Sequence, residues 1–258
     1  MICAGGASGK QSTGRNSLTL VSADEVRRAE LAANLVRVRA RIDAARSAAG
    51  RTDEVTLVAV TKTYPASDVG LLADLGVSDV GENKDQEAAP KAAEIGRRVR
   101  WHFVGQLQRN KAKSVAAYAD VVQSVDSVRL AAALDRAADG HGRVIEVLLQ
   151  VSLDGDPARG GALPGSADPD RGLAPAAEAV VGASALRLAG LMAVAPLGVE
   201  PDRAFARLAE IAAAFHVDHP TATVLSAGMS DDLENAVSHG ATHVRIGSAL
   251  LGKRHYLG

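Results

Sequence analysis

Short apolar segments alternate with amphipathic segments along most of the chain. The apolar segments are rich in Val, Leu and Ile, which is typical of buried β-strands. The segments between them carry apolar residues three or four positions apart, which predicts helices. Because a helix follows each strand, we expect right-handed crossovers and a parallel sheet. The predicted strands cover residues 55–60, 77–80, 99–104, 121–125, 144–151, 186–194, 223–225 and 243–246, and the helices between them cover 66–75, 84–95, 108–118, 127–138, 170–181, 201–215 and 231–239.

A further helix is predicted before the first strand. Ser22 and Glu25 have the spacing of a capping box, apolar residues follow at helical spacing, and Gly50 ends the segment. Eight strands joined by helices are typical of a closed (β/α)8 barrel. The alternative is an open doubly wound sheet, which usually carries a GxGxxG motif after its first strand, where this chain reads AVTKTYP. We therefore expect a single (β/α)8 TIM barrel with an extra N-terminal helix.

The composition agrees with this architecture. Of the 258 residues, 47% are hydrophobic but only 3% are aromatic, so the core must consist mainly of aliphatic side chains and Ala. We expect residues 1–20 to be a disordered tail and residues 21–258 to form one barrel domain. Residues 154–170 are rich in Gly, Pro and Asp, and we expect them to form a loop or lid on the active face.

The charge balance and the cysteine content narrow the class of protein. The 29 Lys and Arg residues nearly balance the 30 Asp and Glu residues, which argues against nucleic acid as the main partner. No apolar segment approaches the roughly 20 residues of a membrane span, and the N-terminus lacks the apolar core of a signal peptide. Cys3 is the single cysteine, so a disulfide framework is excluded. We expect a cytoplasmic protein.

Lys62 directly follows the apolar first strand. The chemistry of a barrel lies where strands end, so we expect Lys62 at the mouth and partly removed from water. Desolvation favours the neutral amine, which is the form that condenses with an aldehyde. The alternative is a structural lysine that reaches solvent or pairs with an acid at the rim.

Glycine and serine residues follow the seventh and eighth strands, in the segments SAGMSDD and RIGSALLG. Loops at these two positions often bind phosphate in this fold. Gly228 and Gly247 would let backbone N–H groups approach an anion. Ser230 and Ser248 would add hydroxyl groups, and a helix that begins at Ser248 would add its dipole. As the alternative, Ser230 is an ordinary helix N-cap.

A reactive lysine opposite a phosphate site favours a phosphorylated aldehyde as ligand, which means pyridoxal 5'-phosphate (PLP). Arg245, two residues before Gly247, would then face the pyridine nitrogen. Arginine does not deprotonate readily and cannot stabilise a pyridinium as Asp does, so the ring would be a weaker electron sink. Such a site suits racemisation or simple carriage of PLP. The alternative for Arg245 is a surface ion pair with Asp231 or Asp232.

Six motifs occur in a fixed order along the chain: AVTKTYPA around Lys62, GEN at 81–83, WHFVGQLQRNK at 101–111, GLMAV from Gly190, LSAGMSDDLE from Leu225 and VRIGSALLG from Val244. With these motifs the chain resembles the pyridoxal phosphate homeostasis protein family, the single-barrel relatives of the alanine racemase N-terminal domain. The resemblance covers about residues 22–252. It implies an alanine racemase-like barrel that binds and buffers PLP, with no firmly established reaction.

The resemblance also implies roles for individual residues. Lys62 would form the internal aldimine with PLP, Arg245 would face the pyridine nitrogen, and Asn83 would lie beside the cofactor. The phosphate would be held by Ser230, Gly247 and Ser248. The chain departs from the common family pattern at Lys84, at Gln106 and at residues 158–161, which bear on access to the mouth.

The histidines are expected to be structural. His102 ends the third strand, and we expect it to be buried and hydrogen-bonded to neighbouring strands, with a general acid–base role as the alternative. Two further pairs, His216 with His219 and His239 with His243, lack a third ligand, so we expect no metal site.

Three functions fit these residues. We favour a non-catalytic carrier, a monomer that holds PLP on Lys62, takes part in PLP homeostasis and releases PLP to apo enzymes. The second is a PLP-dependent amino-acid racemase. Alanine racemases carry a further C-terminal β domain, and this chain ends at Gly258, just beyond the eighth strand. The third is a class I aldolase, whose lysine usually lies on a later strand and whose mechanism does not need Arg245.

Overall fold

Eight parallel strands close into a barrel in the computed structural model of the chain, which describes residues 1–2, 22–156 and 159–252. The strands follow one another in sequence order around the barrel, and β1 pairs with β8 to close it. Closure confirms the predicted (β/α)8 fold and excludes the open sheet. Of the predicted tail, residues 3–20 lie outside the described residues. The strands are β1 (Thr56–Val60), β2 (Asp79–Glu82), β3 (Arg100–Phe103), β4 (Val121–Val125), β5 (Ile145–Gln150), β6 (Leu186–Met192), β7 (Val224–Ser226) and β8 (His243–Ile246).

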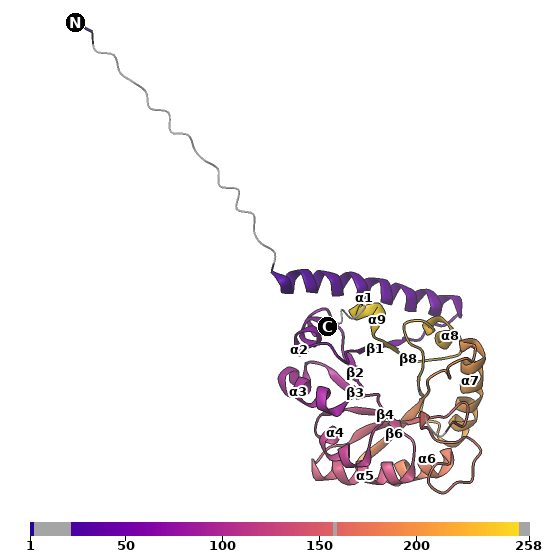
Figure 1. The fold of residues 1–258 in the computed structure, drawn as a ribbon. Helices are drawn as coiled ribbons and strands as arrows, with labels where there is room; N and C mark the ends of the chain where they lie inside the picture. The colour runs from indigo at the N-terminus through magenta and orange to yellow at the C-terminus, as the bar shows by residue number, and fades with distance from the viewer. Residues whose placement is uncertain (3–21, 157–158, 253–258) are drawn as a thin grey trace.

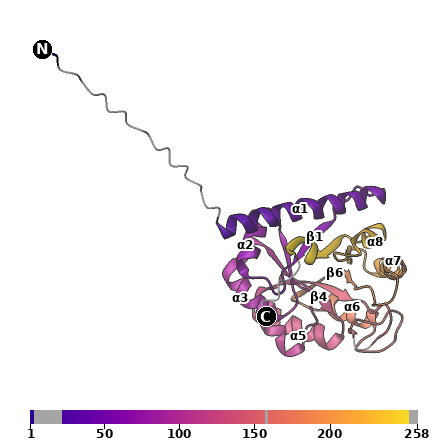
Figure 2. The same ribbon diagram turned by 45° about the horizontal axis from the view of Figure 1, so that its top comes forward.

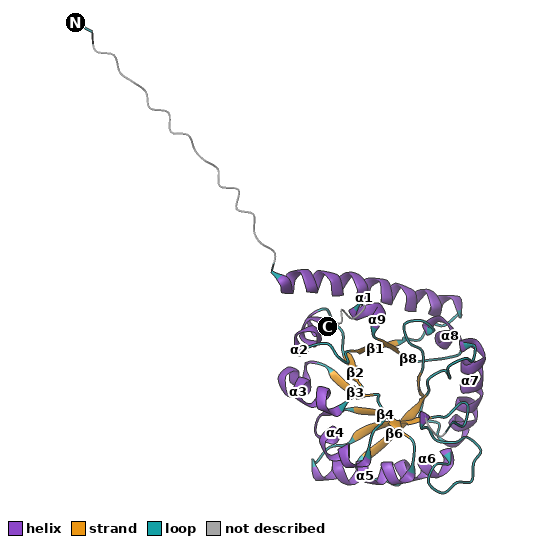
Figure 3. Cartoon of the chain, viewed as in Figure 1, coloured by secondary structure: helices purple, strands orange, loops and turns teal. Residues whose placement is uncertain are grey.

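Helices form a ring outside the strands (Figure 3). Helix α6 begins later than predicted, because the Asp168 carboxylate accepts hydrogen bonds from the N–H groups of Asp170 and Arg171 and holds a turn there. None of the helices in the described part of the chain is long and apolar enough to cross a membrane. The helices after β1 are α2 (Ala66–Asp74), α3 (Asp85–Ile95), α4 (Ala112–Tyr118), α5 (Val128–Gly140), α6 (Leu173–Val181), α7 (Pro201–Asp218), α8 (Leu233–Ser238) and α9 (Ser248–Leu251).

The predicted N-terminal helix is α1 (Ala23–Ala48), which lies along the outside of the barrel beside α8 and α9 (Figure 2). Its capping box is present: Glu25 N donates to Ser22 Oγ at 3.2 Å and Ser22 N donates to Glu25 Oε2 at 2.7 Å. An apolar stripe on α1 is buried, and Asn34 Nδ2 donates to the carbonyl oxygen of Leu250 in α9 at 2.8 Å. Helix α1 therefore fixes the short helix that follows the eighth strand.

Side chains of the strands alternate between the barrel interior and the helical shell. On β1, Val58 and Val60 lie inside, against Gly81 of β2, whereas Ala59 packs in the outer apolar cluster. The same alternation turns Lys62, two residues beyond Val60, toward the interior. Whether a residue lies an even or an odd number of positions from Val60 thus determines whether its side chain faces the barrel interior.

Strand β2 extends to Glu82, two residues beyond its predicted end, and places a carboxylate in the shell behind β1. Glu82 is fully buried, and Lys91 Nζ of α3 lies 2.7 Å from Glu82 Oε1. Lys91 also donates to the Thr61 carbonyl at 2.9 Å, and the Thr61 hydroxyl donates to Glu82 Oε1 at 2.6 Å. Burial raises the pKa of Glu82 above its ordinary value, and the hydrogen bonds from Lys91 and Thr61 offset part of this effect. The Glu82–Lys91 pair therefore fixes Thr61, the residue directly before Lys62.

Replacing Lys91 with Met should lower the free energy of unfolding by about 3 kcal/mol, because it leaves a buried carboxylate without its cation. Chemical denaturation measures this loss. Lys84→Met is the matched control, since Lys84 is exposed and lies 3.8 Å from Glu87, and it should change stability by less than about 0.5 kcal/mol. The double variant Glu82→Gln/Lys91→Met should recover part of the loss. Equal effects of the two single variants would contradict an anchoring role for the pair.

His243 of β8 lies in the barrel interior, with its ring centroid 6.5 Å from that of His102. Burial and the nearby His102 lower the pKa of His243 from 6.5 to about 4. The folded state therefore binds this proton less readily than the unfolded state does.

The free energy of unfolding should fall by roughly 3 kcal/mol as the pH drops from about 6.5 to about 4, because the unfolded chain takes up the His243 proton first. Denaturation at several pH values measures this slope. His243→Asn should remove this part of the pH dependence, and an unchanged slope in that variant would assign the effect to other groups. The Asp79 carboxyl, whose pKa hydrogen bonds from His102 and Ser78 hold below 3.8 against the opposing effect of burial, would act only at lower pH.

Candidate functional site

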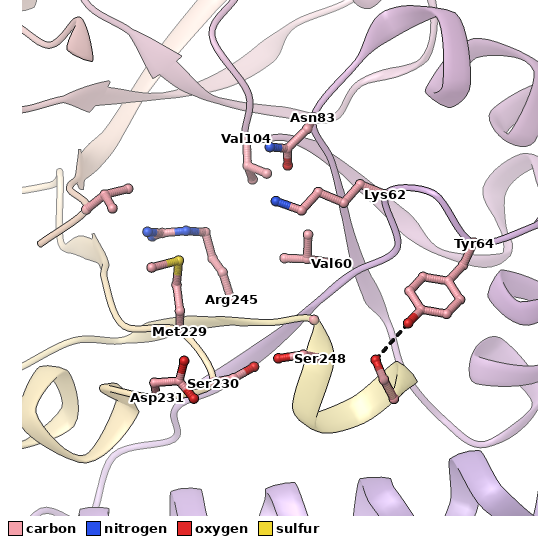
Figure 4. Close-up of a pocket in the computed structure, with 13 residues that line it drawn as sticks. Val60, Lys62, Tyr64, Asn83, Val104, Met229, Ser230, Asp231, Arg245 and Ser248 are labelled. Carbon is pink, nitrogen blue, oxygen red and sulfur yellow. Dashed lines mark hydrogen bonds between the residues drawn. The ribbon is translucent and has the colours of Figure 1, made fainter. Parts of the chain in front are cut away.

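A cavity of about 510 Å³ opens where the strands end, and the six residues to which the family resemblance assigns roles toward PLP line it (Figure 4). Its walls bring together the turn after β1, the residues after β2 and β3, and the loops after β7 and β8. The six are Lys62, Asn83, Ser230, Arg245, Gly247 and Ser248, and the other lining residues are Val60, Tyr64, Val104, Val194, Met229, Asp231 and Gly252.

Lys62 lies in the turn after β1, and its amine points into the cavity (Figure 4). Lys62 Nζ makes no hydrogen bond or ion pair with any described residue, so pairing with an acid at the rim is wrong. Thr63, with φ +70°, is the only non-glycine residue with positive φ in the described part of the chain. Its N–H donates to Glu87 Oε2 at 2.8 Å, which stabilises an unfavourable conformation for a β-branched residue. The backbone turns sharply directly after Lys62 and leaves the amine available.

Arg245 of β8 is buried, and its guanidinium is held by hydrogen bonds. Nη1 donates to Ser226 Oγ at 2.9 Å and Nη2 donates to the Ala193 carbonyl at 2.9 Å. Burial lowers the pKa of Arg245 to about 10, against the opposing effect of Asp232, so the group stays cationic near neutral pH. It forms no ion pair with Asp231 or Asp232, both of which the structure describes, so the surface ion pair is wrong.

The loops after β7 and β8 meet at the other end of the cavity. Ala249 N of α9 donates to Ser230 Oγ at 3.3 Å, which joins the two loops. Ser230 is not a helix N-cap, because α8 begins at Leu233 with Asp232 before it. Helix α9 has only four residues, so the expected helix dipole is that of a single turn. The polar groups at this end are therefore mainly the Ser230 and Ser248 hydroxyls and the backbone around Gly247.

Gly228 does not line the cavity, contrary to the expected contact with an anion. With φ +87°, it packs against α8, where an added Cβ would lie 2.6 Å from Ala236 Cβ. The role of Gly228 is therefore to bring the β7 loop close to α8.

Asn83 follows β2, and its backbone is in close contact with the residues after β3. A Cβ on Gly105 would lie 2.1 Å from the Asn83 carbonyl oxygen, so only glycine fits there. Asn83 also borders a neighbouring cavity of about 610 Å³, whose lining includes Lys84 and Gln106. These two departures from the family pattern therefore lie beside the Lys62 cavity and do not line it.

The remaining candidate groups lie elsewhere. His102 is buried and bonded to Asp79 and Gln123, as expected for a structural histidine. The described residues contain no group of three His, Cys, Asp or Glu side chains that could hold a metal ion. The described residues of the 154–170 loop do not line the cavity, and the proposed lid stays a prediction.

Sequence reasoning missed the apolar walls of the cavity. Val60 precedes Lys62 by two residues, and Val104 follows His102 by two, so strand alternation could have identified both. Met229 lies in the loop after β7, where no strand or helix periodicity predicts the direction of its side chain.

The family model for the alanine racemase N-terminal domain matches residues 33–255. A pyridoxal phosphate homeostasis protein of Mycobacterium tuberculosis is 45% identical over 255 residues, which cover 91% of this chain and 96% of the relative. The structure of PipY from Synechococcus elongatus with PLP bound is similar with a TM-score of 0.71 and 33% identity, over 86% of this chain and 100% of PipY.

An alanine racemase from Corynebacterium glutamicum shares the fold alone, with a TM-score of 0.64 and 17% identity over 90% of this chain and 62% of the racemase. The match to the mycobacterial relative covers nearly the whole length of that protein, so the similarity is not confined to the barrel strands. The chain therefore belongs to the alanine racemase N-terminal domain family and, within it, to the pyridoxal phosphate homeostasis proteins.

Proposed function

We propose that this protein binds PLP in the Lys62 cavity and takes part in PLP homeostasis. The observation that carries the proposal is the convergence of Lys62 and Arg245 with the Ser230 and Ser248 hydroxyls in one cavity. Relatives of the chain are named for PLP homeostasis, and PipY has a structure with PLP bound.

The chemistry of the donor set fits PLP. Two cations, Lys62 and Arg245, face the cavity against one acid, Asp231, which suits an anionic ligand. Val60 and Val104 provide apolar surface for a flat heterocycle. A phosphorylated aromatic aldehyde matches each of these groups.

Each residue of the cavity would have a separate part in binding. PLP supplies an aldehyde that condenses with a primary amine, and Lys62 is the amine that would hold it covalently. Ser230, Gly247 and Ser248 would bind the phosphate through hydroxyl and backbone donors. Arg245 would donate a hydrogen bond to the heterocycle nitrogen, since a guanidinium only donates.

Retention of PLP fits the cavity better than turnover of an amino acid. Removal and return of a proton on opposite faces of a substrate requires two acid–base groups. Lys62 could serve as the acid–base group on one face. Tyr64 is the tyrosine that lines the cavity, but its hydroxyl already donates its proton to the Gly252 carbonyl at 2.8 Å, which does not suit it as the second group. We propose that the monomer is the binding unit. We propose that apo enzymes are the recipients of the released PLP.

Incubation with PLP followed by borohydride reduction should place a phosphopyridoxyl group on Lys62, as peptide mass spectrometry would show. Lys62→Met should lose the adduct. Lys84→Met is the matched control, because Lys84 is exposed and does not line the cavity, and it should keep the adduct on Lys62. An adduct at another lysine in the unaltered protein would refute the proposed site.

Ser248→Asp should weaken PLP binding by about a hundredfold, because a carboxylate near the phosphate adds like-charge repulsion of a few kcal/mol. Equilibrium dialysis measures the affinity. Ser238→Asp, a substitution of an exposed serine at the end of α8, is the control and should bind PLP normally. Normal affinity in Ser248→Asp would exclude the β8 loop from phosphate binding.

A further inference from the structure

Five buried polar side chains form a continuous hydrogen-bonded chain across the barrel interior. Arg245 Nη1 lies 2.9 Å from Ser226 Oγ, and Ser226 Oγ lies 2.7 Å from Gln123 Oε1. Gln123 Nε2 lies 2.8 Å from His102 Nδ1, and His102 Nε2 lies 2.8 Å from Asp79 Oδ1. The chain links β8, β7, β4, β3 and β2, and both of its ends pair in register with Val58 of β1.

The hydrogen bonds of this chain can all run in one direction away from the arginine. A guanidinium has no acceptor, so Ser226 Oγ must accept from Arg245 and its own proton is available for Gln123 Oε1. The amide nitrogen of Gln123 then faces His102 and donates to Nδ1.

In this arrangement His102 Nδ1 accepts from Gln123, and His102 Nε2 donates to Asp79. All donors point from the cation of Arg245 toward the anion of Asp79. In this arrangement every donor of the buried chain faces an acceptor.

Among the described residues, Ser226, Gln123 and His102 make no side-chain hydrogen bond outside this chain. Gln123 and Ser226 are fully buried, and His102 is 2% exposed. None of the four residues after Arg245 lines the Lys62 cavity. Asp79 is held at the far end by the Ser78 hydroxyl at 2.6 Å and borders a separate cavity at the amino ends of β1 and β2. A role of these residues toward a ligand at the mouth must therefore pass through Arg245.

We propose that Ser226, Gln123, His102 and Asp79 are positioning residues that fix the Arg245 guanidinium and aim its remaining donors at the heterocycle nitrogen of bound PLP. This inference rests on the proposed function. Ser226 accepts from one N–H of Arg245 Nη1, and the Ala193 carbonyl accepts from one N–H of Nη2. The other N–H groups of the guanidinium are left for the ligand. Because these four residues do not line the cavity, they would act on the ligand through the position of Arg245.

The test compares two buried serines that differ in this one respect. Ser226→Ala breaks the chain at its first link. Ser124→Ala is the matched control, because Ser124 is 2% exposed, lies on β4, and its Oγ has no hydrogen-bond partner among the described residues. We expect Ser226→Ala to weaken PLP binding about tenfold, the effect of one lost hydrogen bond to a charged group, and to shift the visible absorption maximum of bound PLP. Ser124→Ala should change neither quantity.

A double variant separates one linked chain from independent structural effects. His102 is two hydrogen bonds away from Ser226, with Gln123 between them, and the two residues are not bonded to each other. If the chain acts as a unit, Ser226→Ala/His102→Leu should lose little more PLP affinity than Ser226→Ala alone, whereas the effects of Ser124→Ala and His102→Leu should add. His102→Asn, which can keep an acceptor for Gln123, should restore part of the affinity lost in His102→Leu.

Additive losses, or equal behaviour of Ser226→Ala and Ser124→Ala, would overturn the inference. Thermal unfolding checks that each variant folds, and Gln123→Met, which removes the central link with a side chain of similar length, carries the same expectation if Ser226→Ala does not fold. The borohydride adduct on Lys62 of the unaltered protein keeps the two proposals distinct. Without that adduct the proposed function fails, whereas normal PLP binding in both Ser226→Ala and Gln123→Met refutes only the positioning chain.

Discussion

The parallel pairing of β1 with β8 is the contact on which the rest of the site depends. It closes the barrel and sets Val58 beside Arg245. Because side chains alternate along both strands, this register turns Arg245 and Lys62 toward one cavity although they come from opposite ends of the chain. Outside the barrel, α1 secures the same closure: Asn34 and Arg27 donate to the carbonyl groups of Leu250 and Leu251 in α9.

The two cations of the cavity are held in different ways. Arg245 is fixed by two hydrogen bonds, and its burial removes solvation and lowers its pKa to about 10. Lys62 has a fixed backbone, through Thr61 and the Glu82–Lys91 pair, but its amine has no partner among the described residues. A rigid donor suits recognition of a heterocycle, and an unpaired amine suits a covalent bond that forms and breaks.

The sequence predicted the barrel and most of the cavity residues from local patterns. Strand alternation and position at strand ends are properties of one segment at a time, so Lys62 and Arg245 could be identified without knowing the packing, whereas Asn83 was expected only from the resemblance to the family. The hydrogen-bonded chain could not be predicted. Its members belong to five strands, and which inward side chains meet depends on the tilt and shear of the closed barrel. The burial of Glu82 was missed for a related reason, since its partner Lys91 lies on another element.

The barrel interior explains why Arg245 can remain buried as a cation. Barrel cores are usually filled with layers of branched aliphatic side chains, and a lone guanidinium among them would be strongly destabilising. Here the positive charge at Arg245 is linked through Ser226, Gln123 and His102 to the carboxylate of Asp79. The aligned donors distribute the cost of burial over polar groups that each have a partner. An arginine beside the ligand therefore requires polar side chains in the barrel interior, and these side chains hold its guanidinium in place.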